Sequence, residues 1–226
     1  MKLLLLSNSG KPLYHWCKKE ISQFIGSREV TFISVATVYD PSTYYKAAQE
    51  SLSEMGIKLN HLILEETPKD LISKTEAFLI GGGNTYNLIN QLKKFSLLES
   101  IKEQVSKGAF YVGLSAGANI ASPNILTTND WNVMGSTTFD GLGLVPFNIN
   151  PHYINPHNKK MFSGESRDER ILEYLAFNDN PIVALEEQTY LEVSNNQIRI
   201  GGHGKVKVFV KGKEVKELSA GDDMPF

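Results

Sequence analysis

The chain has 226 residues, of which 41% are hydrophobic and 21% are charged, and its formal net charge is −2. A chain of this size and composition can bury a core without metal or disulfide staples, so neither a fibre nor a disordered tail fits. The 23 basic residues are balanced by 25 acidic ones, which excludes a general nucleic-acid binder. The apolar run Met1 to Leu6 is too short for a signal peptide or a membrane span. The single cysteine, Cys17, has no partner thiol, and we therefore expect a cytoplasmic protein.

Apolar runs without polar alternation recur along the first half of the chain, which is typical of strands covered on both faces. These runs are Lys2 to Leu6, Val30 to Val35, Leu59 to Leu64, Ala77 to Ile80 and Ala109 to Leu114. Segments with helical spacing lie between them, at Leu13 to Phe24, Tyr44 to Met55, Tyr86 to Leu92 and Leu98 to Val105. The alternation predicts an α/β fold with a mostly parallel sheet flanked by helices.

After Pro181 the continuous apolar runs give way to short runs in which apolar and polar residues alternate, and these predict β-hairpins. Just before this point, Ser166 and Glu169 have the spacing of a capping box, which predicts another helix. No Pro- or Ser-rich linker and no internal repeat interrupts the sequence. We therefore expect one domain over residues 1–226, with the hairpins at its carboxyl end.

A nucleophile motif follows the fifth apolar run. The segment Gly113 to Gly117 reads G-x-S-x-G, and it lies between a predicted strand and the small residues of a predicted helix start. Small neighbours allow a sharp turn that exposes the hydroxyl of Ser115, and the amide of Ala116 points at an oxyanion formed there. The alternative interpretation is a glycine-bounded turn whose serine only caps the helix.

A second glycine cluster, Gly81 to Thr85, also joins a predicted strand to a predicted helix. The amides of Gly82 and Gly83 could complete an oxyanion hole, because glycine permits close approach and positive φ. The cluster matches neither a P-loop nor a dinucleotide-binding fingerprint. A plain turn is the competing interpretation.

A serine nucleophile needs a base, and His152 is the best of five histidines because it lies in a rigid, proline-flanked stretch. His157 follows among Asn and Lys residues and is less suitable. An acidic residue must orient the imidazole, and both Asp130 and Glu187 are candidates. The sequence alone does not choose between these two carboxylates.

Long ordered blocks of the sequence strongly resemble the peptidase E, or α-aspartyl dipeptidase, family. They are residues 81–85, 113–119, 127–130, 139–147 and 150–152, together with residues 164–167 and Arg170. The resemblance spans most of the chain, with Ser166 where the family usually has Thr. It implies an α/β fold related to class I glutamine amidotransferases, hydrolysis of dipeptides that begin with aspartate, and neither a metal nor a cofactor.

The resemblance also implies residue roles. Ser115 would be the nucleophile, His152 the general base and Asp130 the favoured acidic partner, with Glu187 as its rival. Arg167 and Arg170 are candidates to bind the substrate carboxylate, because a guanidinium grips a carboxylate with two hydrogen bonds.

Other functions stay open. A cyanophycinase-like peptidase or another serine hydrolase could use the same G-x-S-x-G turn, which we call the nucleophile elbow. A non-catalytic ligand-binding protein could have the same fold and glycine loops. A glutamine amidotransferase is disfavoured, because its elbow carries a thiolate and Cys17 lies far away in the sequence. We expect a monomer or a homodimer.

Overall fold

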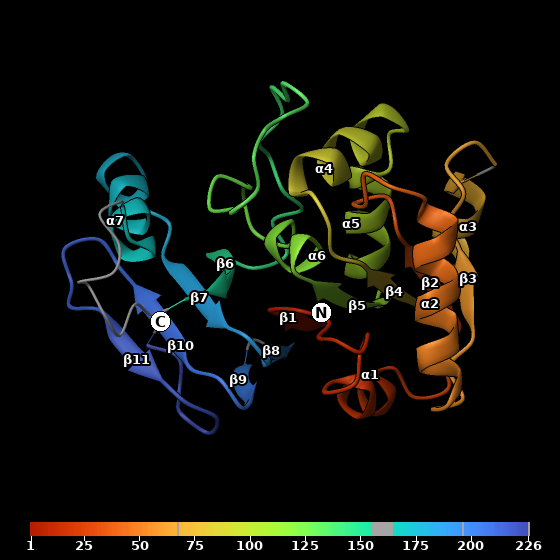
Figure 1. The fold of residues 1–226 in the computed structure, drawn as a ribbon, viewed down its shortest axis with the longest axis horizontal. Helices are drawn as coiled ribbons and strands as arrows, with labels where there is room; N and C mark the ends of the chain where they lie inside the picture. The colour runs from red at the N-terminus through yellow and green to blue at the C-terminus, as the bar shows by residue number, and fades with distance from the viewer. Residues whose placement is uncertain (67, 155–164, 196, 226) are drawn as a thin grey trace.

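The computed structural model describes residues 1–66, 68–154, 165–195 and 197–225. Its strands form two sheets, one of seven strands in the order β3-β2-β4-β5-β1-β8-β9 and one of four strands in the order β11-β10-β7-β6 (Figure 1). In the larger sheet β1 to β5 run parallel, and β8 and β9 are antiparallel to their neighbours. Helices lie on both faces of its parallel part.

The strands of the larger sheet are β1 (Lys2–Leu6), β2 (Val30–Ile33), β3 (Leu59–His61), β4 (Ala77–Ile80), β5 (Phe110–Leu114), β8 (Thr189–Ser194) and β9 (Gln197–Gly202). Those of the smaller sheet are β6 (Asn148–Tyr153), β7 (Ile182–Glu186), β10 (Val206–Phe209) and β11 (Lys216–Leu218). The helices are α1 (Lys18–Ile25), α2 (Pro41–Ser53), α3 (Pro68–Lys74), α4 (Thr85–Lys94), α5 (Leu98–Ser106), α6 (Ala116–Asn119) and α7 (Arg167–Phe177).

The core follows from the alternation of side chains along the buried strands. In β1, Leu3 and Leu5 face one layer of helices, whereas Leu4 and Leu6 face the other. All four are fully buried. The layer that contains Leu4 also holds Cys17, as expected of a small core residue.

The α/β fold predicted from the sequence is confirmed, with shifts at the element boundaries. The first helix begins at Lys18 rather than at Leu13, because residues 10–17 form turns. β2 and β3 end earlier than their apolar runs, and the remaining apolar residues enter loops. The capping box opens α7, where Ser166 and Glu169 bond reciprocally to each other's backbone amides. Among the described residues, no helix has both the length and the apolar character needed to cross a bilayer.

The carboxyl-terminal strands divide between the two sheets. The hairpin β8–β9 extends the larger sheet, because β8 pairs with β1 in antiparallel register. β10 and β11 pair with each other and, through β7, build the smaller sheet. The sequence did not predict strand β6, which pairs in parallel with β7. The link from β7 to β8 therefore passes from one sheet to the other.

Candidate active site

Ser115 lies on a sharp turn between β5 and α6, and its backbone has φ +52° and ψ −108°. A non-glycine residue rarely adopts this conformation, so the packing around it must impose the strain. A Cβ atom at Gly113 would lie 2.3 Å from the carbonyl oxygen of Gly117, and one at Gly117 would lie 2.3 Å from that of Ile80. Only glycine fits at either place, which gives the G-x-S-x-G pattern its physical reason.

The loop after β4 approaches Ser115 from the neighbouring strand. A Cβ atom at Gly82 would lie 3.2 Å from Cβ of Ser115, so the peptide backbone passes close to the hydroxyl. Gly83 has φ +141°, and a Cβ atom there would lie 2.4 Å from the carbonyl oxygen of Ala36. The amides of Gly83 and Ala116 have no hydrogen-bond acceptor among the described residues. The amide of Gly82 donates to the hydroxyl of Tyr44 at 3.2 Å.

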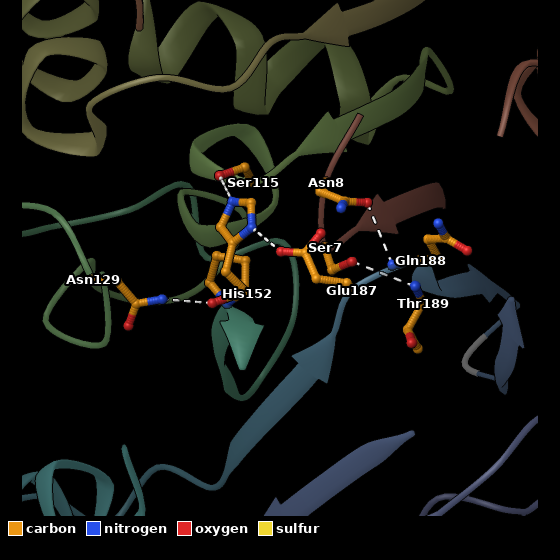
Figure 2. Close-up of polar contacts among 9 residues, drawn as sticks. Ser7, Asn8, Ser115, Asn129, His152, Glu187, Gln188 and Thr189 are labelled. Atoms are coloured by element: carbon orange, nitrogen blue, oxygen red, sulfur yellow. Dashed lines mark hydrogen bonds and ion pairs between the residues drawn. The ribbon is translucent and has the colours of Figure 1, made fainter. Parts of the chain in front are cut away.

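His152 is aimed at the serine by an irregularity in β6. The pairing of β6 with β7 shifts register between Asn150 and Tyr153, and His152 has φ +54°. A bulge of this kind turns a side chain away from the direction that a regular strand would give it. As a result, Nε2 of His152 lies 2.6 Å from Oγ of Ser115 (Figure 2).

Glu187 occupies the turn that carries the chain from β7 to β8. Its Oε1 lies 2.5 Å from Nδ1 of His152 (Figure 2). The turn is tied to the end of β1, because the amides of Gln188 and Thr189 donate to the side chains of Asn8 and Ser7 at 3.3 and 3.4 Å. Gly202 supports it from the other side, where a Cβ atom would lie 2.1 Å from the carbonyl oxygen of Gln188.

The two contacts of His152 assign its protons. A carboxylate only accepts hydrogen bonds, so Nδ1 carries the proton that is donated to Glu187. In the neutral imidazole, Nε2 is then unprotonated and accepts the hydrogen bond from Ser115. We call His152 and Glu187, which move and stabilise the proton of Ser115, the relay. Their side chains are 40% and 50% exposed, so the relay is open to solvent.

Asp130, the carboxylate preferred from the sequence, makes no contact with His152, so the geometry favours Glu187 as the orienting carboxylate. Its Oδ2 accepts hydrogen bonds from the amide and the hydroxyl of Thr85, each at 2.7 Å, and from the hydroxyl of Thr128 at 3.0 Å. These contacts fasten the loop around Asp130 to the start of α4. A carboxylate is favourable at a helix start, where backbone amides lack acceptors. Asp130 is thus tied to the scaffold, and Glu187 takes the place beside the imidazole.

A cavity of about 560 Å³ contains this constellation. It lies at the carboxyl ends of β1, β2, β4 and β5, which is where ligands bind in open parallel sheets. Its lining includes Ser115, His152, Glu187, Gly82 and Gly83. It also includes residues that the sequence analysis did not select, namely Asn8, Ser9, Gly10, Lys11, Thr37, Tyr44 and Leu114. A small peptide fits a cavity of this size.

The two candidate arginines have different surroundings. Arg167 is partly buried and donates to Oδ1 of Asn129. Nδ2 of Asn129 in turn donates to the carbonyl of Pro151, the residue before His152 (Figure 2). No carboxylate of the described residues pairs with Arg167. Burial, and secondarily the charge of Arg170, lower the pKa of Arg167. Arg170 lies on the surface and faces Glu165 at 3.7 Å.

The remaining histidines lie elsewhere. His15 contacts the carbonyl of Pro12 from a turn rather than from a helix surface, and His61 contacts Ser34. The amide of His203 donates to the carbonyl of Gln188, so the turn at His203 supports the turn that carries Glu187. His157 lies outside the described residues.

A serine on a strained strand-to-helix turn, bonded to a histidine that a carboxylate orients, is the constellation of a serine hydrolase. The comparisons with known proteins agree with this class. The model of peptidase family S51 matches residues 3–201, and the chain belongs to this family. The resemblance to peptidase E is thereby confirmed.

The relatives match over nearly their whole length. The peptidase E of Nostoc sp. strain PCC 7120 is 37% identical over 236 residues, covering 100% of this chain and 96% of the relative. The peptidase E of Salmonella arizonae is 38% identical, covering 98% of this chain and 99% of the relative. The crystal structure of a peptidase from an acI-B1 actinobacterium shares the fold, with a TM-score of 0.76 and 18% identity, and the match covers 100% of this chain and 96% of that one.

Proposed function

We propose that the chain is a serine dipeptidase that hydrolyses Asp-Xaa dipeptides through an acyl-enzyme on Ser115. The observation that carries the proposal is the continuous contact from Ser115 through His152 to Glu187 inside a cavity of dipeptide size. Membership of family S51 and the likeness to proteins named peptidase E support it.

The mechanism begins when His152 takes the proton of Ser115 and the serine oxygen attacks the aspartyl carbonyl. Glu187 stabilises the imidazolium that results. The amides of Ala116 and Gly83 donate hydrogen bonds to the oxyanion. Gly82 is the third residue of this oxyanion hole, and its backbone forms the wall beside Ser115. His152 then protonates the leaving amine, and water releases aspartate from Ser115.

Arg167 is the proposed partner of the substrate side-chain carboxylate. It is a partly buried guanidinium that no carboxylate of the described chain neutralises, and Asn129 links it to the residue before His152. Arg170 is the weaker candidate because it already faces Glu165 on the surface. Substitution of Arg167 by Met should reduce kcat/KM for Asp-Leu far more than for Asn-Leu, the uncharged counterpart. Equal losses for the two dipeptides would show that Arg167 does not bind the side-chain carboxylate.

Release of free amino acid from Asp-Leu, Asn-Leu and Leu-Leu tests the substrate assignment, with a chelator present throughout. Strong preference for Asp-Leu is the expected result. Equal cleavage of all three dipeptides would favour a peptidase of other specificity, and cleavage of none would contradict the proposal. We also propose that the protein acts as a monomer or a homodimer in the cytoplasm, and the free thiol of Cys17 supports this location.

A further inference from the structure

Tyr44 is a cavity residue that the mechanism above does not use. It lies in the first half of α2 and lines the cavity together with Ser115. Its ring packs against Gly81, where a Cβ atom would come within 2.6 Å of Cε1 of the tyrosine. It also meets Phe32 edge to face, with ring centroids 5.3 Å apart. These contacts fix the direction of the hydroxyl group.

The hydroxyl of Tyr44 accepts a hydrogen bond from the amide of Gly82. A phenol has one hydrogen to donate, and the amide leaves that hydrogen free. Burial raises the pKa of Tyr44, so the group keeps its proton at neutral pH. The buried hydroxyl of Tyr14 lies beside that of Tyr44: the contact lowers the pKa of Tyr44 and adds to the rise that burial causes in the pKa of Tyr14, as expected when Tyr14 donates and Tyr44 accepts, so Tyr44 keeps its own hydrogen to donate.

The bond to Tyr44 also changes what the glycine loop can offer. The amide of Gly82 already has an acceptor, whereas the amides of Gly83 and Ala116 have none among the described residues. The loop passes close to the serine, because a Cβ atom at Gly82 would lie 3.2 Å from Cβ and 3.7 Å from Oγ of Ser115. The Tyr44 hydroxyl is held against this loop at Gly82 and lines the same cavity as Ser115.

We propose that the Tyr44 hydroxyl is a catalytic residue that donates a hydrogen bond to the oxyanion of the tetrahedral intermediate on Ser115. The inference rests on the proposed acyl-enzyme mechanism. Tyr44 keeps its proton throughout, so no bond is broken in it. Donors that are fixed before the reaction are effective because they need no reorganisation when the charge develops. The bond from Gly82 polarises the hydroxyl and strengthens its donation.

Tyr44→Phe tests the proposal, with Tyr45→Phe as the matched control. Both changes remove one hydroxyl from adjacent residues of α2, but Tyr45 donates to the carbonyl of Leu59 at 3.1 Å and does not line the cavity. For Asp-Leu, kcat of Tyr44→Phe should fall on the order of 10²-fold with little change in KM, because the interaction forms only in the transition state. Tyr45→Phe should leave kcat unchanged.

A second readout separates this inference from the substrate assignment. A fluorophosphonate forms a tetrahedral adduct on an active serine whatever the natural substrate is, so the rate of Ser115 labelling should also fall in Tyr44→Phe. Slow labelling of this variant together with no Asp-Leu cleavage by the wild type would keep the inference and reject the dipeptidase. Phenylalanine preserves the contacts with Gly81 and Phe32, and equal thermal midpoints of the two variants would confirm that both fold.

The proposal would be overturned if Tyr44→Phe matched Tyr45→Phe in both assays. An increase in kcat would also overturn it, because it would show that Tyr44 withholds the Gly82 amide from the oxyanion. A loss expressed in KM alone would assign Tyr44 to ground-state binding. Absence of Ser115 labelling in the wild type would remove the intermediate on which the inference depends.

Discussion

The nucleophile and its proton-transfer partners are held by differently built parts of the molecule. Ser115 follows a parallel strand of the larger sheet, and residues within two positions of it impose its strained backbone. His152 lies 37 residues away in the smaller sheet, and Glu187 lies a further 35 residues along the chain. A bulge and a turn between sheets, rather than a local motif, bring these two side chains to the serine.

The difference shows where sequence patterns carry information about chemistry. The elbow consists of consecutive residues, so the spacing of its glycines around Ser115 predicts it. The relay depends on pairing between distant segments, including Ser7 and Asn8 with the turn at Glu187. Substitutions at the relay, at its supporting turn and at the loop of Asp130 should consequently differ in how much they lower kcat and how much they lower stability.

Glu187→Gln is expected to lower kcat more than any other substitution that distinguishes the roles of Glu187 and Asp130. Loss of the charge removes the partner of Nδ1 and should lower kcat by about 10³- to 10⁴-fold, as expected for the acidic member of a triad. Asp130→Asn is the matched control, because Asp130 contacts Thr85 and Thr128 rather than the imidazole. Initial rates with Asp-Leu measure both. A larger loss in Asp130→Asn would reverse the assignment.

A smaller loss of kcat is expected from Gly202→Ala. This change disturbs the turn that holds Glu187 but alters neither His152 nor Glu187. The added Cβ atom would lie 2.1 Å from the carbonyl of Gln188, so the turn at Glu187 must move. Displacement of an orienting group by a fraction of an ångström should cost roughly 10- to 10²-fold in kcat. Gly212→Ala is the control, because that glycine also has positive φ but nothing within 4 Å of its Cβ position. Equal activities of the two variants would show that the support is dispensable.

Asp130→Ala should affect stability more than chemistry. The amide of Thr85 loses its acceptor at the start of α4, which should lower the free energy of unfolding by about 1–3 kcal/mol. Urea denaturation measures the loss, and kcat of the folded variant should stay within about tenfold of the wild type. Full stability combined with lost activity would place Asp130 in the reaction.

The smallest effect concerns pH and lies away from the active site. Burial lowers the pKa of His61 below its usual 6.5, partly offset by the charge of Asp40. The unfolded chain therefore binds a proton more readily, so this residue's contribution to stability declines as pH falls from about 6.5 through the folded pKa. In urea unfolding at pH 7.5 and pH 5.5, His61→Gln should lose less stability on acidification than the wild type. An equal loss in both proteins would contradict the shift.

Much of the fold and half of the site could be predicted from the sequence, because buried parallel strands and the elbow leave local patterns. Strand β6 escaped prediction because Pro151 and its asparagines lack the alternation of an ordinary strand. The carboxylate could not be chosen, since Asp130 and Glu187 differ only in what distant segments place beside them. The sequence gives no sign that separates Tyr44 from its neighbour Tyr45, because its place in the cavity and its contact with Gly82 depend on distant segments.

The most direct test of the central claim is hydrolysis of Asp-Leu by the wild type and by Ser115→Ala, with a chelator in both reactions. The account predicts rapid release of aspartate by the wild type and a loss of at least about 10⁴-fold in the variant, with no effect of the chelator. Aspartate release that survives Ser115→Ala would show that the strained serine is not the nucleophile and would contradict the account.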